Sequence, residues 1–400
     1  MVLANGTFMF GPSGKDGLNQ QALLNPSDLT WTVTGTGMIG NNPEAAFTLL
    51  PDGHVLMVDS TLPTNASTEM MDPTSGAWTS AGTLPAPLID PTTAGAGPVG
   101  EIGPDILMPN GTVFAEGSNS ATDVYNTTTG KWSAGPSFAP INGASLSAGD
   151  CPAAILPDGN VLTDVSSPGF HGANGYAFIF DGTSLTQIAR PPGGPVGFDG
   201  CQGEMLDLAN GQVLLNTLMG NKGVDLYTST GTPNPSWLPQ ITNVANSLVA
   251  GSTDTLSGQQ LNGLTQGLAF GDNFQDATNY PLVQITNQWT GDVTYARSMN
   301  MTSMSVASMT PSSTQFQLPA SLEDGPSQLR VVASGVASAP VSVTVTGGTP
   351  ETDPSATTTT LAPRKPPAKK HRTIVCVDGK KMKRITGVAP RCPSGFKLKR

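Results

Sequence analysis

The sequence is poor in charged residues, in histidine and in long apolar segments. Asp, Glu, Lys and Arg make up 12% of its 400 residues, and there are only three histidines. Because helical surfaces are usually rich in Lys, Glu and Arg, this scarcity disfavours a helical protein. No apolar stretch reaches the ~20 residues of a membrane-spanning helix. Gly and Pro are abundant instead, with 47 and 35 residues, which indicates short strands joined by turns.

The few charges are divided unevenly along the chain. Residues 364–400 hold thirteen Lys or Arg and a single acid, Asp378, a net charge of +12. The remaining residues hold 6 basic and 28 acidic side chains, a net charge of −22. The body and the tail therefore attract partners of opposite charge.

A hairpin pattern recurs five times in the first 216 residues. Each copy has an Asn-Gly or Asp-Gly pair before a β-rich apolar run, as in LPDGHVLMV (50–58) and LPDGNVLTDV (156–165). Such pairs favour two-residue type I′ turns between strands. The turn glycines are spaced by 47, 58, 48 and 52 residues and are Gly6, Gly53, Gly111, Gly159 and Gly211.

A tryptophan follows four of these five turns at a similar offset. Trp31, Trp78, Trp132 and Trp237 come 21 to 26 residues after the preceding turn glycine. The fourth repeat keeps the offset in IFDGTSLTQ but lacks its tryptophan. Two strands around a tight turn, a loop, and two further strands ending with Trp make a four-stranded unit. A coincidence of turns in a β-sandwich is the alternative.

This unit of about 50 residues resembles the kelch repeat, which forms one blade of a β-propeller. The usual double glycine after the second strand is missing, so the resemblance is to the bacterial repeats of galactose-oxidase-like proteins. It implies an all-β protein with a kelch-type propeller over residues 1–242 and five legible blades. Such propellers have seven blades, and the first repeat lacks its leading strand. We therefore expect either an N-terminally truncated ring or a small five-bladed one, in a chain cut at its start.

The pattern changes near residue 243. In residues 243–347 apolar and polar side chains alternate, as in VSVTV (341–345), which favours a β-sandwich. This stretch resembles the immunoglobulin-like (E-set) module that follows the propeller in galactose-oxidase-like proteins. Residues 348–372 form a Thr/Pro-rich linker. Residues 373–400 form a small basic Cys-containing tail, which we expect to be disordered and which resembles an appendage of secreted actinobacterial proteins.

The four cysteines suggest two disulfides. Cys151 and Cys201 lie eight and ten residues before the turn glycines of adjacent repeats, where the inner strands of neighbouring blades converge. Cys376 and Cys392 are placed to close a short loop in the tail. An even count without CxxC spacing favours an oxidising compartment over zinc binding; free buried thiols are the alternative. We therefore expect a secreted, extracellular or cell-wall-associated protein.

The resemblance to galactose oxidase suggests copper chemistry, but the expected ligands are incomplete. That family holds one copper ion with two His and two Tyr, one Tyr being cross-linked to a Cys. His371 lies in the tail, His54 follows a turn glycine on the opposite rim, and Tyr295 stands where the family has a copper-binding His. Only His171 could face the propeller mouth. We therefore expect no cofactor and no oxidase activity, with a copper-dependent galactose- or glyoxal-oxidase-like enzyme as the alternative.

A carboxylate precedes the first strand of four repeats, 9 to 12 residues before the turn glycine. In a propeller these loops share one face, so the carboxylates would form an acidic ring around the mouth, on the same rim as His171. Such a ring would hold a cation or sugar hydroxyls; solvated loop carboxylates are the alternative. The four residues are Glu44, Glu101, Asp150 and Asp199.

These features predict a secreted or cell-envelope-associated binding or scaffold protein. The propeller face would bind carbohydrate or another polar ligand, and the tail would bind an anionic cell-envelope polymer. A tail that only aids secretion or solubility is the alternative. The tail has no aromatic residue beyond Phe396, so no sequence-specific nucleic-acid binding is expected. A glycan-cleaving hydrolase would instead need two mouth carboxylates about 5–10 Å apart.

Overall fold

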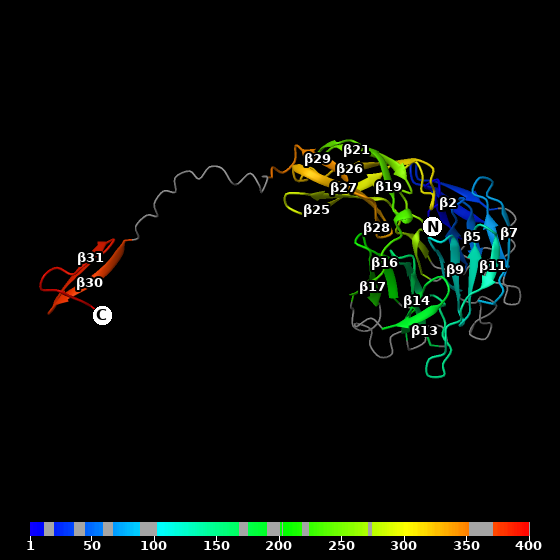
Figure 1. The fold of residues 1–400 in the computed structure, drawn as a ribbon, viewed down its shortest axis with the longest axis horizontal. Helices are drawn as coiled ribbons and strands as arrows, with labels where there is room; N and C mark the ends of the chain where they lie inside the picture. The colour runs from blue at the N-terminus through cyan, green and yellow to red at the C-terminus, as the bar shows by residue number, and fades with distance from the viewer. Residues whose placement is uncertain are drawn as a thin grey trace. The chain divides into compact units, whose positions relative to one another are not determined.

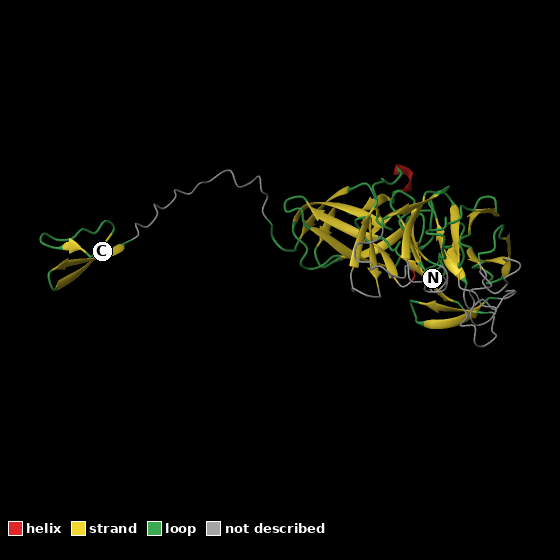
Figure 2. Cartoon of the chain, turned by 90° about the horizontal axis from the view of Figure 1, so that it is seen from below, coloured by secondary structure: helices red, strands yellow, loops and turns green. Residues whose placement is uncertain are grey.

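The prediction of an all-β protein is confirmed. In the computed structural model, the described residues contain many strands and the short 3-10 helix η2 (Pro235–Trp237), but no α-helix (Figure 2). None of their helical segments has the length and apolar character needed to cross a membrane. The chain divides into two compact units, residues 1–351 and 352–400. The described residues are 1–11, 20–35, 45–58, 67–88, 102–167, 175–189, 201, 203–217, 224–270, 274–351 and 371–399.

The five repeated turns share one hydrogen-bond pattern. In the third repeat, the Gly111 N–H donates to the Met108 carbonyl (3.0 Å) and the Met108 N–H donates to the Thr112 carbonyl (2.7 Å). The Asn110 side chain accepts from the Thr112 N–H (3.0 Å), and only the glycine of the Asn-Gly pair has a positive φ, +82°. The predicted type I′ turn is therefore wrong, because it requires positive φ at both central residues; the loop has three residues and a glycine bulge. The same bonds recur at Gly6, Gly53, Gly159 and Gly211.

Each turn belongs to one antiparallel sheet whose strands follow in chain order. We number these sheets 1 to 5. Sheet 1 contains β1 (Phe8–Phe10), β2 (Gln21–Asn25) and β3 (Thr30–Thr34); sheet 2 contains β4 (Ala46–Leu49), β5 (Val55–Val58), β6 (Ser67–Met71) and β7 (Trp78–Thr83); sheet 3 contains β8 (Ile102–Leu107), β9 (Thr112–Gly117), β10 (Thr122–Asn126) and β11 (Lys131–Ala134); sheet 4 contains β12 (Pro152–Ile155), β13 (Val161–Ser166), β14 (Gly175–Phe180) and β15 (Leu185–Ile188); sheet 5 contains β16 (Gly203–Asp207), β17 (Gln212–Thr217) and β18 (Val224–Thr228).

Neighbouring sheets pack face to face through apolar side chains. The rings of Phe114 on β9 and Phe180 on β14 stack with centroids 3.9 Å apart, between sheets 3 and 4. The Trp132 indole N–H donates to the Thr68 hydroxyl (3.0 Å), between sheets 2 and 3. The first strands β4, β8, β12 and β16 contact one another in that order. The five sheets therefore follow one another in a curved series, which can be followed through β2, β5, β9, β14 and β17 in Figure 1. The four first strands that contact one another are called inner strands below.

The tryptophan of the fifth repeat departs from the pattern. Trp237 lies on η2 rather than on a fourth strand, so sheet 5 ends at β18. Its ring lies against the turn of the preceding repeat, where a Cβ on Gly159 would be only 2.6 Å away. The four-stranded prediction is thus correct for sheets 2 and 3 and wrong for sheet 5.

A nine-stranded sheet follows sheet 5 and encloses a core that includes Leu256, Val283, Phe316 and Val331. Eight of its strands run in the order β19-β21-β26-β25-β24-β27-β29-β20, and β28 pairs with β27. The pairing of β20 with β29 is parallel. The strands are β19 (Gln240–Val244), β20 (Ser247–Val249), β21 (Thr253–Gln259), β24 (Leu282–Asn287), β25 (Val293–Met299), β26 (Ser312–Gln317), β27 (Gly325–Ala333), β28 (Val336–Ala337) and β29 (Val341–Thr346).

One hairpin from the same region of the chain belongs to sheet 4 and not to the nine-stranded sheet. Strands β22 (Gly267–Phe270) and β23 (Phe274–Ala277) pair with each other, and β22 pairs with β12 so that Ala269 lies opposite Ala153. Strand β22 also contacts β8 and β16, and β23 contacts β4. The hairpin therefore covers the inner edge of sheet 4, and the division of the chain at residues 242 and 243 stays a prediction.

The second unit is a small sheet of three strands, β30 (Arg372–Asp378), β31 (Lys381–Gly387) and β32 (Lys397–Leu398), with β30 in the middle. The predicted disulfide between Cys376 and Cys392 is present, and Cys376 is fully buried. The prediction of a disordered tail is wrong for these residues. The β-branched run TIVCV forms the central strand, and the disulfide fixes the returning segment.

The turn geometry generates a stability prediction. Replacing Gly111 with Ala should destabilise the protein by about 1–2 kcal/mol, because an L side chain is strained at positive φ. Gly111→Asn should cost less, since Asn adopts this conformation more readily. Urea unfolding of the three proteins measures the difference. Equal losses for Ala and Asn would contradict a backbone origin.

Candidate functional site

The inner strands of sheets 3, 4 and 5 begin next to one another. The Asp150 N–H donates to the Ile102 carbonyl (3.1 Å), which joins the segment before β12 to the first residue of β8. Cys151 and Cys201 form the predicted disulfide, which joins the segments before β12 and β16. Both cysteines are buried. The residues at this end of β8, β12 and β16, called the inner-strand rim below, form the candidate site.

Only one of the five predicted ligand-binding residues lies among the described residues. Asp150 is at the inner-strand rim, is 7% exposed and has a φ of +55°. Its burial differs from the solvated loop carboxylate considered as the alternative. Glu101, Asp150 and Asp199 precede β8, β12 and β16 in the sequence, and the beginnings of these three strands lie next to one another. The other predicted residues, Glu44, Glu101, Asp199 and His171, lie outside the described residues.

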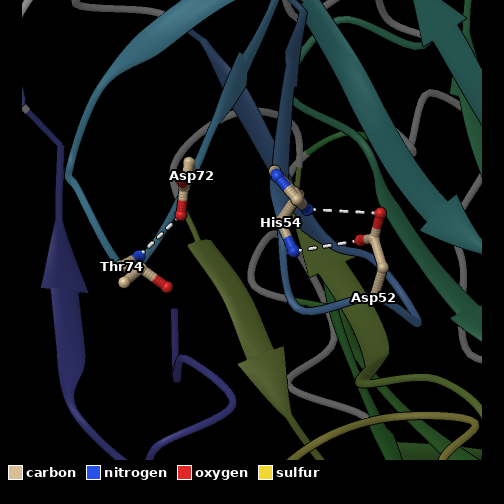
Figure 3. Close-up of polar contacts among 4 residues, drawn as sticks. All are labelled: Asp52, His54, Asp72 and Thr74. Carbon is tan, nitrogen blue, oxygen red and sulfur yellow. Dashed lines mark hydrogen bonds and ion pairs between the residues drawn. The ribbon is translucent and has the colours of Figure 1, made fainter.

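His54 lies in the turn between β4 and β5, at the end of this hairpin that is remote from the beginning of β4. Its Nδ1 is 3.2 Å from Asp52 Oδ2, and its backbone N–H donates to Asp52 Oδ1 (3.0 Å) (Figure 3). In the last turn of the same sheet, the Thr74 N–H donates to Asp72 (2.8 Å), and this bond lowers the pKa of the Asp72 carboxyl. Asp52 and Asp72 therefore stabilise their turns by accepting backbone hydrogen bonds, and this role requires no bound ligand.

Tyr295, matched from sequence to a copper-binding His, lies on β25 of the nine-stranded sheet. It is 42% exposed, and its hydroxyl accepts a hydrogen bond from Gln284 Nε2 (2.8 Å). The strands that reach the inner strands are β22 and β23 instead. Among the described residues, no three His, Cys, Asp or Glu side chains are grouped to hold a metal ion. His171, the one histidine expected at the mouth, lies outside the described residues, so the copper-dependent alternative stays a prediction.

Sequence reasoning missed a group of buried carboxylates in sheets 3 and 4. Asp105 on β8, Glu116 on β9, Asp123 on β10 and Asp164 on β13 are each at most 3% exposed. The Thr163 hydroxyl donates to Glu116 Oε2 (2.9 Å). Both carboxylate oxygens of Asp105, Oε1 of Glu116 and Oδ2 of Asp164 have no hydrogen-bond partner. Their burial could have been inferred from the repeat. Glu116 and Asp164 lie five residues after a turn glycine, and the equivalent residue of the second repeat is the apolar, buried Val58.

Burial raises the pKa of all four groups, because the charged form loses its hydration. The pKa of Asp164 rises to about 8 and that of Asp123 to about 7, the latter despite a hydrogen bond from the Ala86 N–H. The pKa values of Asp105 and Glu116 also lie well above their usual values, and neighbouring carboxylates raise them further. At neutral pH Asp164 therefore keeps its proton and can both donate and accept a hydrogen bond.

Comparisons with known proteins assign no family to this arrangement. No family model and no curated protein matches the chain. The extracellular domain of a hybrid two-component system from B. thetaiotaomicron is 7% identical, with a TM-score of 0.30; the match covers 86% of this chain and 44% of that one. Kuenenia stuttgartiensis hydrazine synthase is 12% identical (TM-score 0.35; 66% and 64% covered). A protein described as a 6-phosphogluconolactonase from Bacteroides uniformis is 12% identical (TM-score 0.32; 72% and 80% covered).

The buried acids predict that stability falls as the pH rises. A carboxyl with a native pKa of about 8 holds its proton while the unfolded chain releases it near pH ~3.9. The stabilisation is therefore complete below pH ~4 and is lost progressively up to about pH 8. In thermal unfolding between pH 5 and 8.5, Asp164→Asn should show a smaller decrease in Tm than the unaltered protein.

Asp181 provides the matched control for this measurement. It lies in an exposed turn, and hydrogen bonds from Ser184 and Thr183 lower its pKa to about 2. Asp181→Asn should therefore leave the slope between pH 5 and 8.5 unchanged. Identical slopes for Asp164→Asn and the unaltered protein would show that Asp164 is ionised in the native state.

Proposed function

We propose that this chain is a secreted or cell-envelope-associated binding protein. In this proposal sheets 1 to 5 form part of a kelch-type β-propeller, and the nine-stranded sheet forms an immunoglobulin-like module beside it. The inner-strand rim binds a polar ligand such as a glycan, and the C-terminal unit tethers the protein to an anionic polymer. The tether has the most direct support.

The propeller interpretation is supported by three repeated features. The same hydrogen-bonded turn recurs in each of the five sheets. The sheets pack on one another in chain order, and the first strands of sheets 2 to 5 are neighbours. The uncovered faces of sheets 1 and 5 are also apolar: they expose Trp31 and Val33 in sheet 1 and Val224 and Leu226 in sheet 5. Stacked blades around an axis are the arrangement in which such a series of sheets buries its faces.

The extracellular location is supported by the two disulfides. All four cysteines are paired, one pair within each compact unit. Disulfides of this kind persist in oxidising compartments and are rare in the reducing cytosol. The two disulfides are therefore compatible with secretion.

The tether is supported by the charge on the C-terminal unit, which is the observation that carries the proposal. Every described Lys and Arg of this unit is exposed, and Asp378 is the only acid among its described residues, 371–399. The fold holds these cations on a disulfide-closed sheet, so less side-chain and backbone freedom is lost on binding than in an unfolded tail. The residues are Arg372, Lys380, Lys381, Lys383, Arg384, Arg391, Lys397 and Lys399.

We predict salt-sensitive retention on an anionic polymer. The full chain should bind polyphosphate- or heparin-coated beads at about 0.05 M salt and be released near 1 M, where charges are screened beyond ~3 Å. A triple variant with Lys381→Gln, Lys383→Gln and Arg384→Gln should elute at clearly lower salt. The charge-preserving variant with Lys381→Arg, Lys383→Arg and Arg384→Lys is the control. Equal elution of both variants would remove the support for a tether.

We also predict that Asp150 contributes to binding at the inner-strand rim. Asp150→Asn preserves the shape and tolerates the positive φ, but removes the charge. Oligosaccharides selected on a glycan array should bind this variant at least ~10-fold more weakly in calorimetry, because a charged hydrogen bond is lost. Asp52→Asn, at the opposite end of β4, should have no effect. A glycan that binds both variants equally does not bind at this rim.

A further inference from the structure

A cavity of about 110 Å³ lies between sheets 4 and 5. On the sheet 4 side it is lined by Asp164, Ala177 and Ile188, which lie opposite one another on β13, β14 and β15. On the sheet 5 side it is lined by Met205, Leu215 and Asp225, which form the matching row on β16, β17 and β18. The walls are thus mostly apolar, with a carboxyl group at one end of each row.

The cavity lies where two other sheet interfaces hold an indole ring. Gln21, Thr68 and Ala177 occupy equivalent places, each four residues before the Asn or Asp of the last turn of its sheet. In those turns Asn25, Asp72 and Asp181 accept from the N–H two residues later. Trp78 donates its indole N–H to Gln21 Oε1 (2.8 Å), and Trp132 donates to Thr68 Oγ1 (3.0 Å).

Among the described residues, no indole lines the equivalent place beside Ala177. The described part of sheet 5 ends at β18, so no fourth strand brings a side chain into this position. The tryptophan of that repeat, Trp237, lies on η2 against Gly159. The cavity between sheets 4 and 5 therefore occupies the place that the indole rings of Trp78 and Trp132 fill at the other two interfaces.

The cavity also contains an unsatisfied polar group. Asp164 is 2% exposed, and its Oδ2 has no hydrogen-bond partner. A buried polar atom without a partner is unfavourable, because its hydration is lost without compensation. Apolar cavities of roughly 150 Å³ bind benzene-sized molecules in other proteins, and here the carboxyl group would add a directed hydrogen bond.

We propose that the cavity between sheets 4 and 5 binds a small aromatic molecule that carries one O–H or N–H group. The ring takes the place of the missing indole between Ala177, Ile188 and Leu215. The polar group bonds to Asp164, as the indole N–H groups bond to Gln21 and Thr68 in the other two interfaces. This site is separate from the inner-strand rim and from the C-terminal unit, so it does not depend on the proposed function.

Phenol and toluene test the proposal, because they have nearly the same shape and only phenol has a hydroxyl group. Phenol should raise the Tm of the full chain in a concentration-dependent manner, since a ligand that binds only the native state stabilises it. Saturation-transfer NMR should show contact with its ring protons. Asp164→Leu should weaken phenol binding by ~10-fold and change toluene binding far less.

A cavity-filling variant provides the second test. Ala177→Leu should abolish the binding of both molecules while keeping or raising the Tm. Gln187→Leu adds the same side chain at an exposed position of β15 and should leave binding unchanged. If Ala177→Leu does not fold, as judged by circular dichroism, Ile188→Phe replaces it. The proposal is overturned if phenol near its solubility limit gives neither a Tm increase nor saturation transfer, or if the filled variant binds phenol normally.

Discussion

The packing of one apolar sheet face on the next is the interaction on which the rest of the first unit depends. Three or four short antiparallel strands are marginal by themselves and need a covered face to be stable. Phe114 and Phe180 show how this cover is provided, since each belongs to a different repeat and both are fully buried. At the rim, the disulfide between Cys151 and Cys201 joins the segments that precede the first strands of sheets 4 and 5. The recurring turn fixes the register of each sheet, and the register decides which side chains face the neighbouring sheet. The contacts between sheets therefore depend on the turns.

The repeats made much of this arrangement predictable. Asn-Gly and Asp-Gly pairs at regular spacing located the five hairpins, and equivalent positions in neighbouring repeats identified the pair Cys151 and Cys201. The turn type was wrong because the Asx side chain accepts from the N–H two residues later, as Asn110 does from Thr112. That bond stabilises a loop in which only the glycine has a positive φ.

Other features had no local signal. The β22–β23 hairpin is short, with the strand sequences GLAF and FQDA, and nothing within it specifies β12 as its partner. The position of Trp237 depends on its contact with Gly159, a residue 78 positions earlier in the sequence. The folded tail was missed because its charge suggested disorder, while the pairing of Cys376 with Cys392 outweighs that charge. Of the candidate site, the sequence located Asp150 and the disulfide, but not the buried acids.

The buried acids follow from a polar position that the repeat places at every sheet interface. Gln21 and Thr68 occupy this row between sheets 1 and 2 and between sheets 2 and 3, and each accepts an indole N–H. Between sheets 3 and 4 the row holds Glu116, which lies opposite Thr122 and accepts from Thr163.

Between sheets 4 and 5 the same row holds Asp164, whose Oδ2 has no partner. At the other three interfaces the residue of this row accepts a hydrogen bond from the next sheet, although Oε1 of Glu116 also has no partner. Desolvation without a hydrogen bond is unfavourable, and an acid responds by keeping its proton. A neutral acid beside an indole-sized space costs stability in the free protein and gains a partner when a ligand supplies one. The departure from the repeat, rather than the repeat itself, is what distinguishes this interface from the others.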